Sequence, residues 1–191
     1  MRSELLNVPN LLSFSRVPLT VVLCAAIAAE WWLVALLTFA LAAFTDWLDG
    51  WWARKFNQLS AVGRALDPLT DKVLIASAFI FLIPVEKSGI HPWMVAVVVV
   101  REVLITGLRG IVEATGKSFG ADWFGKLKTV LQCAVLIGVL LPKTLVANDW
   151  LSTVVPAIEL LQLGLLVSML VATVGSGCQY FVRAAKLLSP S

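Results

Sequence analysis

Residues 45–72 read TDWLDGWWARKFNQLSAVGRALDPLTDK and place four aspartates between two long apolar segments. Asp46 and Asp49 are three residues apart, so they share one face at the end of the first predicted helix. Asp67 and Asp71 are four residues apart and share one face near the start of the next. Because a short turn joins the two segments, the helices are expected to be antiparallel neighbours. The four carboxylates are therefore predicted to converge between them.

The whole chain divides into six apolar segments of roughly the 20 residues that a bilayer core demands of a helix. Apolar residues make up 59% of the chain, charged residues 14%, and the mean hydropathy is +0.89, too apolar for a soluble fold of this size. No Pro-, Gly- or Ser-rich linker and no internal repeat is visible. The sequence predicts an all-α polytopic membrane protein, with residues 1–191 as a single domain and a short interfacial segment before Leu12. Its six transmembrane helices, in one bundle, are expected at Asn10–Ala29, Trp31–Arg54, Ser60–Val85, Pro92–Glu113, Trp123–Leu141 and Leu151–Arg183.

The placement of basic residues predicts how these segments cross the membrane. Of the fifteen lysines and arginines, only Lys87 and Lys143 fall on the side opposite the others. The positive-inside rule then puts both termini and the aspartates at the cytoplasmic face of the cell (inner) membrane. The net charge of +3 suits basic cytoplasmic loops and does not argue for nucleic acid as a partner. One histidine, His91, and three scattered cysteines argue against a zinc site.

Four acids at the membrane edge need a physical reason, because each is costly at membrane depth. Clustered carboxylates repel one another unless a cation lies among them, and oxygen ligands without histidine or cysteine favour Mg²⁺, Mn²⁺ or Ca²⁺. Gly50, Ala53 and Gly63 lack bulk on the same helix faces, which permits close approach of a helix or a nucleotide. The alternative interpretation is that the aspartates cap helices and pair with neighbouring basic residues in the headgroup zone.

A second stretch, residues 101–130, reads REVLITGLRGIVEATGKSFGADWFGKLKTV and carries basic residues in and beside apolar segments. Arg109 lies about two helical turns beyond Arg101, close to the same face, and Lys126 opens the next segment. Such a group predicts a phosphate pocket, because guanidinium groups match phosphate oxygens. The alternative is that basic side chains snorkel to the headgroups, which we favour for Lys117 and Lys128.

The aspartate pattern, with its intervening small and basic residues, resembles the signature of the CDP-alcohol phosphotransferases. That family consists of six-helix membrane bundles with a cytoplasmic site. The resemblance implies that Asp46, Asp49, Asp67 and Asp71 hold two Mg²⁺ or Mn²⁺ ions, and that Asp71 also takes the proton from the acceptor hydroxyl. It further implies a CDP-lipid pocket lined by Asp46, Gly50, Ala53, Arg54 and Gly63, and a homodimer.

The basic stretch is similar to the branch of that family formed by the phosphatidylglycerophosphate synthases. This resemblance implies transfer of a phosphatidyl group from CDP-diacylglycerol to glycerol 3-phosphate, with Arg101, Arg109 and Lys126 binding the acceptor's phosphate. Within the family, inositol phosphate, phosphatidylglycerol (giving cardiolipin) and serine remain alternative acceptors, although serine fits the arginines less well. Outside it, buried acids could mark an ion or proton transporter, but no repeat or midplane site supports one. A non-catalytic scaffold would leave the converging aspartates unexplained.

Overall fold

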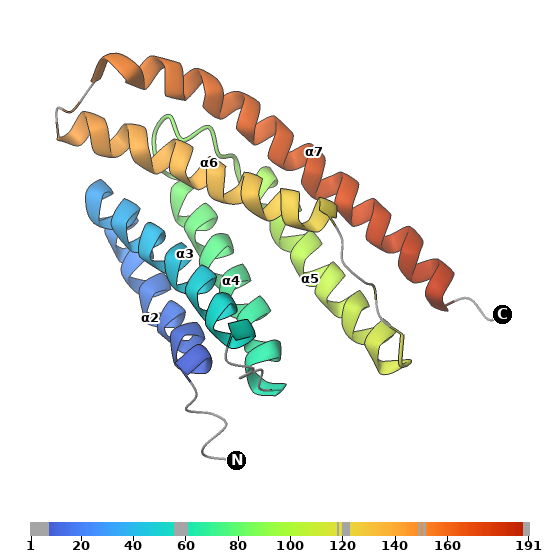
Figure 1. The fold of residues 1–191 in the computed structure, drawn as a ribbon. Helices are drawn as coiled ribbons and strands as arrows, with labels where there is room; N and C mark the ends of the chain where they lie inside the picture. The colour runs from blue at the N-terminus through green and yellow to red at the C-terminus, as the bar shows by residue number, and fades with distance from the viewer. Residues whose placement is uncertain are drawn as a thin grey trace. The chain divides into compact units, whose positions relative to one another are not determined.

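The computed structural model describes residues 8–55, 61–117, 119, 123–148, 150 and 152–188. This part of the chain folds into six α-helices and one 3₁₀ turn (Figure 1), which confirms the all-α prediction. The elements are α2 (Val8–Ala28), α3 (Trp32–Lys55), α4 (Ala61–Leu82), α5 (Pro92–Ala114), α6 (Trp123–Ala147), η1 (Ser152–Val154) and α7 (Val155–Leu188).

The helices follow the predicted segments closely, and they differ mainly at their ends. α5 begins at Pro92, which suits a first helical position because that residue's missing N–H would have no helical partner. α6 runs past the predicted end at Leu141 to Ala147, with Pro142 inside the helix. The last segment opens with the turn η1, and α7 extends beyond the predicted end at Arg183. Most of the predicted interfacial segment before Leu12 lies outside the described residues.

Two of the described helices, α6 and α7, are long and apolar enough to cross a membrane. Shorter apolar stretches cover Phe14–Ala28 and Trp32–Asp46. In α3 and α4 the apolar run is shortened by the charged residues of the 45–72 stretch, which fall at adjoining helix ends. The prediction of six spans therefore goes further than this finding and stays a prediction.

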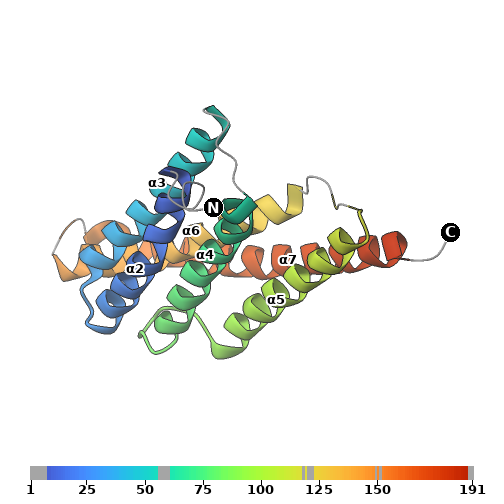
Figure 2. The same cartoon turned by 90° about the horizontal axis from the view of Figure 1, so that it is seen from below.

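The chain divides into two compact units, and each has its own core. The first contains residues 1–85 and 140–155; within it, α2 packs against both α3 and α4 (Figure 2). On α3, Ala35, Phe39 and Ala42 recur at helical spacing and are buried, whereas Leu37 and Leu41 are exposed. Apolar residues thus occupy the outer as well as the inner face of this helix.

The second unit contains residues 86–139 and 156–191, and so holds α5, the first part of α6 and most of α7. Its chain enters α5 through a tight turn in which Lys87 and Gly89 have φ angles of 56° and 68°. The side chain of Gln162 on α7 donates a hydrogen bond to the carbonyl of Ser88 in this turn. Polar side chains also join α5, α6 and α7 in this unit, through contacts of Arg101, Lys128 and Ser176.

Candidate active site

The first cluster joins one side chain from each of α2, α3 and α4 in the first unit. Nη1 of Arg16 donates to Oδ1 of Asp46 at 2.8 Å and also contacts Oδ1 of Asp71. The Arg16 side chain is fully buried, while those of Asp46 and Asp71 are 48% and 37% exposed. The two carboxylates therefore share one cation on their inner side and are open to solvent on the other.

The remaining residues of the predicted metal and nucleotide sites cannot be placed in the same detail. The backbones of Asp49 and Asp67 lie in α3 and α4, on the helices that carry Asp46 and Asp71, but their side chains lie outside the described set. The same holds for the CDP-lipid pocket predicted at Gly50, Ala53, Arg54 and Gly63. Among the side chains that are described, no group of three or more potential metal ligands comes together. Convergence of all four aspartates stays a prediction.

The described part of this cluster fits a divalent cation by its chemistry. Asp46 and Asp71 come from helices far apart in sequence, yet the same guanidinium nitrogen contacts an oxygen of each. Carboxylates brought this close repel one another, so the arrangement requires positive charge between or beside them. Carboxylate oxygens are the ligands that Mg²⁺ and Mn²⁺ prefer, and the exposed outer oxygens leave a route for an ion to enter.

Arg16 is a residue of this cluster that sequence reasoning missed. From the sequence, Arg16 is only one of the thirteen basic residues predicted on the cytoplasmic side. A signal was present, because a cation inside an apolar helix must pair with an anion from a neighbouring element. The sequence alone does not say which anion, since the partners lie 30 and 55 residues away.

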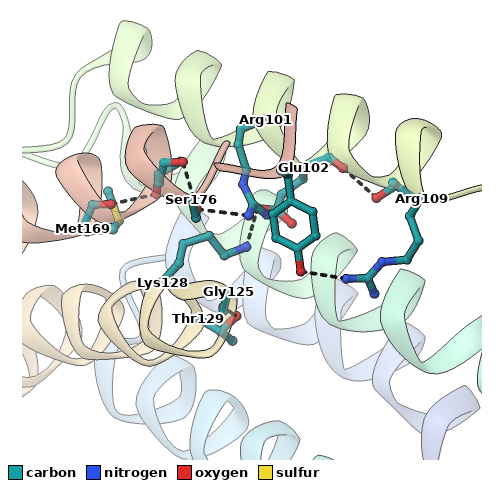
Figure 3. A network of polar contacts seen from close by, with 11 residues as sticks. Arg101, Glu102, Arg109, Gly125, Lys128, Thr129, Met169 and Ser176 are labelled. Atoms are coloured by element: carbon teal, nitrogen blue, oxygen red, sulfur yellow. Dashed lines mark hydrogen bonds and ion pairs between the residues drawn. The ribbon is translucent and has the colours of Figure 1, made fainter. Parts of the chain in front are cut away.

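The second cluster, in the second unit, contains two of the predicted phosphate-binding residues (Figure 3). Arg101 on α5 donates from Nη1 to Oε1 of Glu102 at 3.1 Å and from Nη2 to Oγ of Ser176 on α7 at 3.0 Å. Nζ of Lys128 on α6 contacts the same Glu102 oxygen. Although Glu102 follows Arg101 directly and starts about 100° around the helix, the flexible side chains still meet.

Tyr180 on α7 links Arg101 to the second predicted arginine. Nη2 of Arg109 donates to the Tyr180 phenol oxygen at 3.0 Å. The guanidinium carbons of Arg101 and Arg109 lie 5.5 Å and 5.8 Å from the centre of the Tyr180 ring, within the range of cation–π attraction. One aromatic side chain thus contacts both arginines, and the cluster runs from the mostly buried Arg101 outward to the exposed Arg109.

The two lysines in the first turns of α6, Lys126 and Lys128, differ in their exposure. Lys126 is exposed, whereas Lys128 is buried. Two residues apart on a helix, they point to nearly opposite faces. The snorkelling interpretation is therefore wrong for Lys128, because its amine is held by Glu102 rather than by solvent. Participation of Lys126 in the phosphate pocket stays a prediction.

Ser176 and Tyr180 are also residues that the sequence analysis did not select. They are four residues apart and so share a face of α7. Tyr180 is the only tyrosine of the chain and lies in its last apolar segment. A serine and a tyrosine on one face of an apolar helix are a detectable signal, but their partners on α5 follow only from the structure.

Comparison with known proteins shows the family to which this sequence is similar. The sequence profile described as CDP-alcohol phosphatidyltransferase matches residues 6–174. A Bacillus subtilis (strain 168) protein named CDP-diacylglycerol–glycerol-3-phosphate 3-phosphatidyltransferase is 39% identical over 109 residues, which cover 57% of this chain and 55% of the relative. The Oryza sativa subsp. japonica protein named CDP-diacylglycerol–glycerol-3-phosphate 3-phosphatidyltransferase 1, chloroplastic, is 44% identical over 122 residues. The match covers 64% of this chain and 36% of the relative.

A Salmonella choleraesuis (strain SC-B67) protein, again named CDP-diacylglycerol–glycerol-3-phosphate 3-phosphatidyltransferase, is 38% identical over 139 residues. The match covers 68% of this chain and 74% of the relative. The chain thus spans 55% and 36% of the length of the first two relatives and a larger share of the third.

Proposed function

Because the chain belongs to the CDP-alcohol phosphatidyltransferase family, we propose that it transfers the phosphatidyl group of CDP-diacylglycerol to glycerol 3-phosphate. An acceptor hydroxyl oxygen forms a bond to the phosphorus of the diacylglycerol-bearing phosphate, and the bond from that phosphorus to CMP breaks. The products are phosphatidylglycerophosphate and CMP. The observation that carries the proposal is the family match over residues 6–174, supported by relatives that bear the name of this reaction.

CDP-diacylglycerol is proposed to bind at the four aspartates, which serve as ligands of two Mg²⁺ or Mn²⁺ ions. Bound there, the ions would neutralise the diphosphate of CDP-diacylglycerol and stabilise the negative charge on departing CMP. The contact of Asp46 and Asp71 with one cationic nitrogen supports this role, because it shows that the two carboxylates can surround a single positive charge. Asp49 and Asp67 complete the proposed ligand set.

Asp71 is proposed to have a second role as the base for the acceptor hydroxyl. A carboxylate within reach of that hydroxyl can take its proton as the oxygen attacks phosphorus. The partial exposure of Asp71 supports access by an acceptor from solvent. The nucleotide end of the donor is proposed to lie along the face lined by Asp46, Gly50, Ala53, Arg54 and Gly63, where small residues leave room.

The phosphate of glycerol 3-phosphate is proposed to bind to Arg101, Arg109 and Lys126. The buried cluster supports this assignment by its charge. The group contains three cations, Arg101, Arg109 and Lys128, and the carboxylate of Glu102 contacts Arg101 and Lys128. Guanidinium groups gathered in this way favour an anionic ligand, because their geometry matches that of phosphate oxygens.

The setting is proposed to be the cell (inner) membrane, with six spans and both termini in the cytoplasm. Two helices of suitable length and apolar character, and apolar residues on outward faces of a third, support a lipid environment. CDP-diacylglycerol is itself a lipid, so a membrane-embedded site is where the donor can be reached. Association of two copies into a homodimer is part of the proposal and depends on family resemblance.

A direct test is release of CMP by the purified full chain in detergent with CDP-diacylglycerol and Mg²⁺ or Mn²⁺. We expect release with glycerol 3-phosphate, little with serine or without an acceptor, and none after chelation of the metal. Parallel reactions with inositol phosphate and with phosphatidylglycerol test the rival acceptors. CMP release with inositol phosphate but not glycerol 3-phosphate would replace the acceptor and keep the reaction class; no release with any acceptor would contradict the reaction itself.

A further inference from the structure

Tyr180 has hydrogen-bonding capacity that its contacts in the protein do not use. Its side chain is buried, and its oxygen accepts a hydrogen bond from Arg109. A phenol also carries one O–H donor. Within the described residues, the bond from Arg109 is the only hydrogen bond at this oxygen, so the O–H proton is left for an acceptor that the described chain does not supply. Buried polar hydrogens are seldom left in this way.

A second unused donor lies in the same cluster. Nε of Arg101 is buried and has no hydrogen-bond partner in the described part of the chain, although both terminal nitrogens of that guanidinium are bonded. Glu102 is already engaged by Arg101 and Lys128. Tyr180 contacts both arginines, since its ring centre lies 5.5 Å from the guanidinium carbon of Arg101 and 5.8 Å from that of Arg109, and its oxygen accepts the hydrogen bond from Arg109. The two unused donors therefore belong to one group of side chains that also contains the guanidinium groups of Arg101 and Arg109.

We infer that Tyr180 is a ligand-binding residue, whose phenol donates a hydrogen bond to a phosphate oxygen of the acceptor while it accepts one from Arg109. The inference rests on the proposed function, since the acceptor there carries a phosphomonoester. A phosphate oxygen is a strong acceptor that can take the phenol proton and attract both arginines. The ring fixes the arginines by cation–π contact, and the hydroxyl adds a directional bond.

Tyr180→Phe separates these two contributions. Phenylalanine keeps the ring against Arg101 and Arg109 but removes the hydroxyl, and with it both the bond to Arg109 and the bond to phosphate. A hydrogen bond to a charged group is worth enough that its loss corresponds to roughly tenfold or more in affinity. Tyr180→Leu removes the ring as well, so we expect a larger loss. Phe181→Leu, at the exposed neighbouring position on α7, serves as the matched control.

The experiment measures KM for glycerol 3-phosphate and, separately, KM for CDP-diacylglycerol in the four proteins. We expect Tyr180→Phe to raise KM for glycerol 3-phosphate roughly tenfold, with KM for CDP-diacylglycerol and the behaviour of Phe181→Leu close to wild type. A merely structural tyrosine would lower the midpoint of thermal unfolding and leave the ratio of the two KM values unchanged. That second outcome overturns the inference.

A binding measurement distinguishes failure of the inference from failure of the proposed function. Glycerol 3-phosphate and inorganic phosphate are titrated into wild type and Tyr180→Phe, and the shift in unfolding temperature is recorded. We expect a concentration-dependent shift in wild type that needs roughly tenfold more ligand in the variant. Equal shifts, or none in either protein, overturn the role of Tyr180. If wild type binds phosphate through Tyr180 but releases no CMP, the proposed reaction is contradicted and the proposed role of Tyr180 in phosphate binding is retained.

Discussion

Asp71 carries two proposed roles, ligand of a metal ion and base for the acceptor hydroxyl. Asp71→Asn keeps an oxygen ligand but cannot accept the proton at neutral pH. We expect it to lower turnover by about 10²–10⁴-fold while the protein stays folded and still binds CDP-diacylglycerol. CMP release and lipid-binding assays measure the two effects, with Asp46→Asn, which alters a proposed metal and nucleotide ligand but not the proposed base, as the comparison. Full activity in Asp71→Asn would remove the base role.

Arg16 supplies the positive charge that Asp46 and Asp71 share. Its removal should therefore lower the free energy of unfolding most when metal is absent. Breaking a buried ion pair costs about 3–5 kcal/mol, and the partial exposure of both carboxylates reduces this. We expect Arg16→Gln to lower the free energy of unfolding by about 1–3 kcal/mol in chelator.

Adding Mn²⁺ should restore more stability to Arg16→Gln than to wild type, because two carboxylates without their guanidinium gain more from a divalent ion. Chemical denaturation with and without Mn²⁺ measures the difference, and Arg183→Gln, which removes the same charge from α7, is the control. Equal gains from Mn²⁺ in both proteins would show that Arg16 and the metal do not share these carboxylates.

At the scale of single elements, sequence predicted the helices well because apolar length and periodicity determine them locally. The predicted start of the helix at Pro92 agrees with the structure, since proline suits a first turn. The predicted end of this segment at Leu141 is too early, because α6 continues through Pro142 to Ala147. Lys128 was misjudged for a different reason: the sequence gives its angle on α6 but not the carboxylate on α5 that faces it.

The turn before α5 makes a prediction that belongs to this scale. Gly89 has a φ of 68°, and a Cβ built on it would lie 3.1 Å from Cδ1 of Leu166. Since a left-handed conformation costs other residues roughly 1–2 kcal/mol, Gly89→Ala should lower the free energy of unfolding by at least that amount. Gly164→Ala is the control, because a Cβ there meets nothing within 4 Å. Thermal or chemical denaturation compares the two, and equal stability would mean that the turn relaxes without cost.

At the scale of the whole molecule, the contacts that define both clusters are the part that sequence could not provide. Arg16 reaches partners on α3 and α4, and Arg101 reaches Ser176 across 75 residues of chain. Helical spacing predicts which residues lie on the same face of one helix. It does not predict which residues of a neighbouring helix pack against them. The aspartate pattern could be recognised because its residues lie close in sequence, on either side of one turn. The roles of Ser176 and Tyr180 could be recognised only from the packing of α7 against α5.

Membrane topology is the remaining prediction at this scale, and the distribution of basic residues supplies its physical reason. Cytoplasmic loops retain lysine and arginine because moving these charges across the bilayer is unfavourable. With Lys87 and Lys143 the only two of fifteen basic residues assigned to the far side, an even number of crossings is expected. The connections after α2, α4 and α6 should then face away from the cytoplasm, and those after α3 and α5 toward it.

Labelling of single cysteines, introduced into a chain whose own cysteines are replaced, tests this predicted topology. Glu30, Glu86 and Asn148 are exposed positions at the connections expected outside, and Glu113 and Lys186 are exposed positions expected inside. In intact cells, a membrane-impermeant maleimide should label cysteine at the first three positions and reach the last two only after permeabilisation. The pattern requires that α5, α6 and α7 each cross, because the loss of any one of these crossings would exchange the labelling of every later position, and it requires an even number of crossings between Glu30 and Glu86. Labelling of Lys186→Cys in intact cells would therefore contradict the six-span arrangement with a cytoplasmic C-terminus.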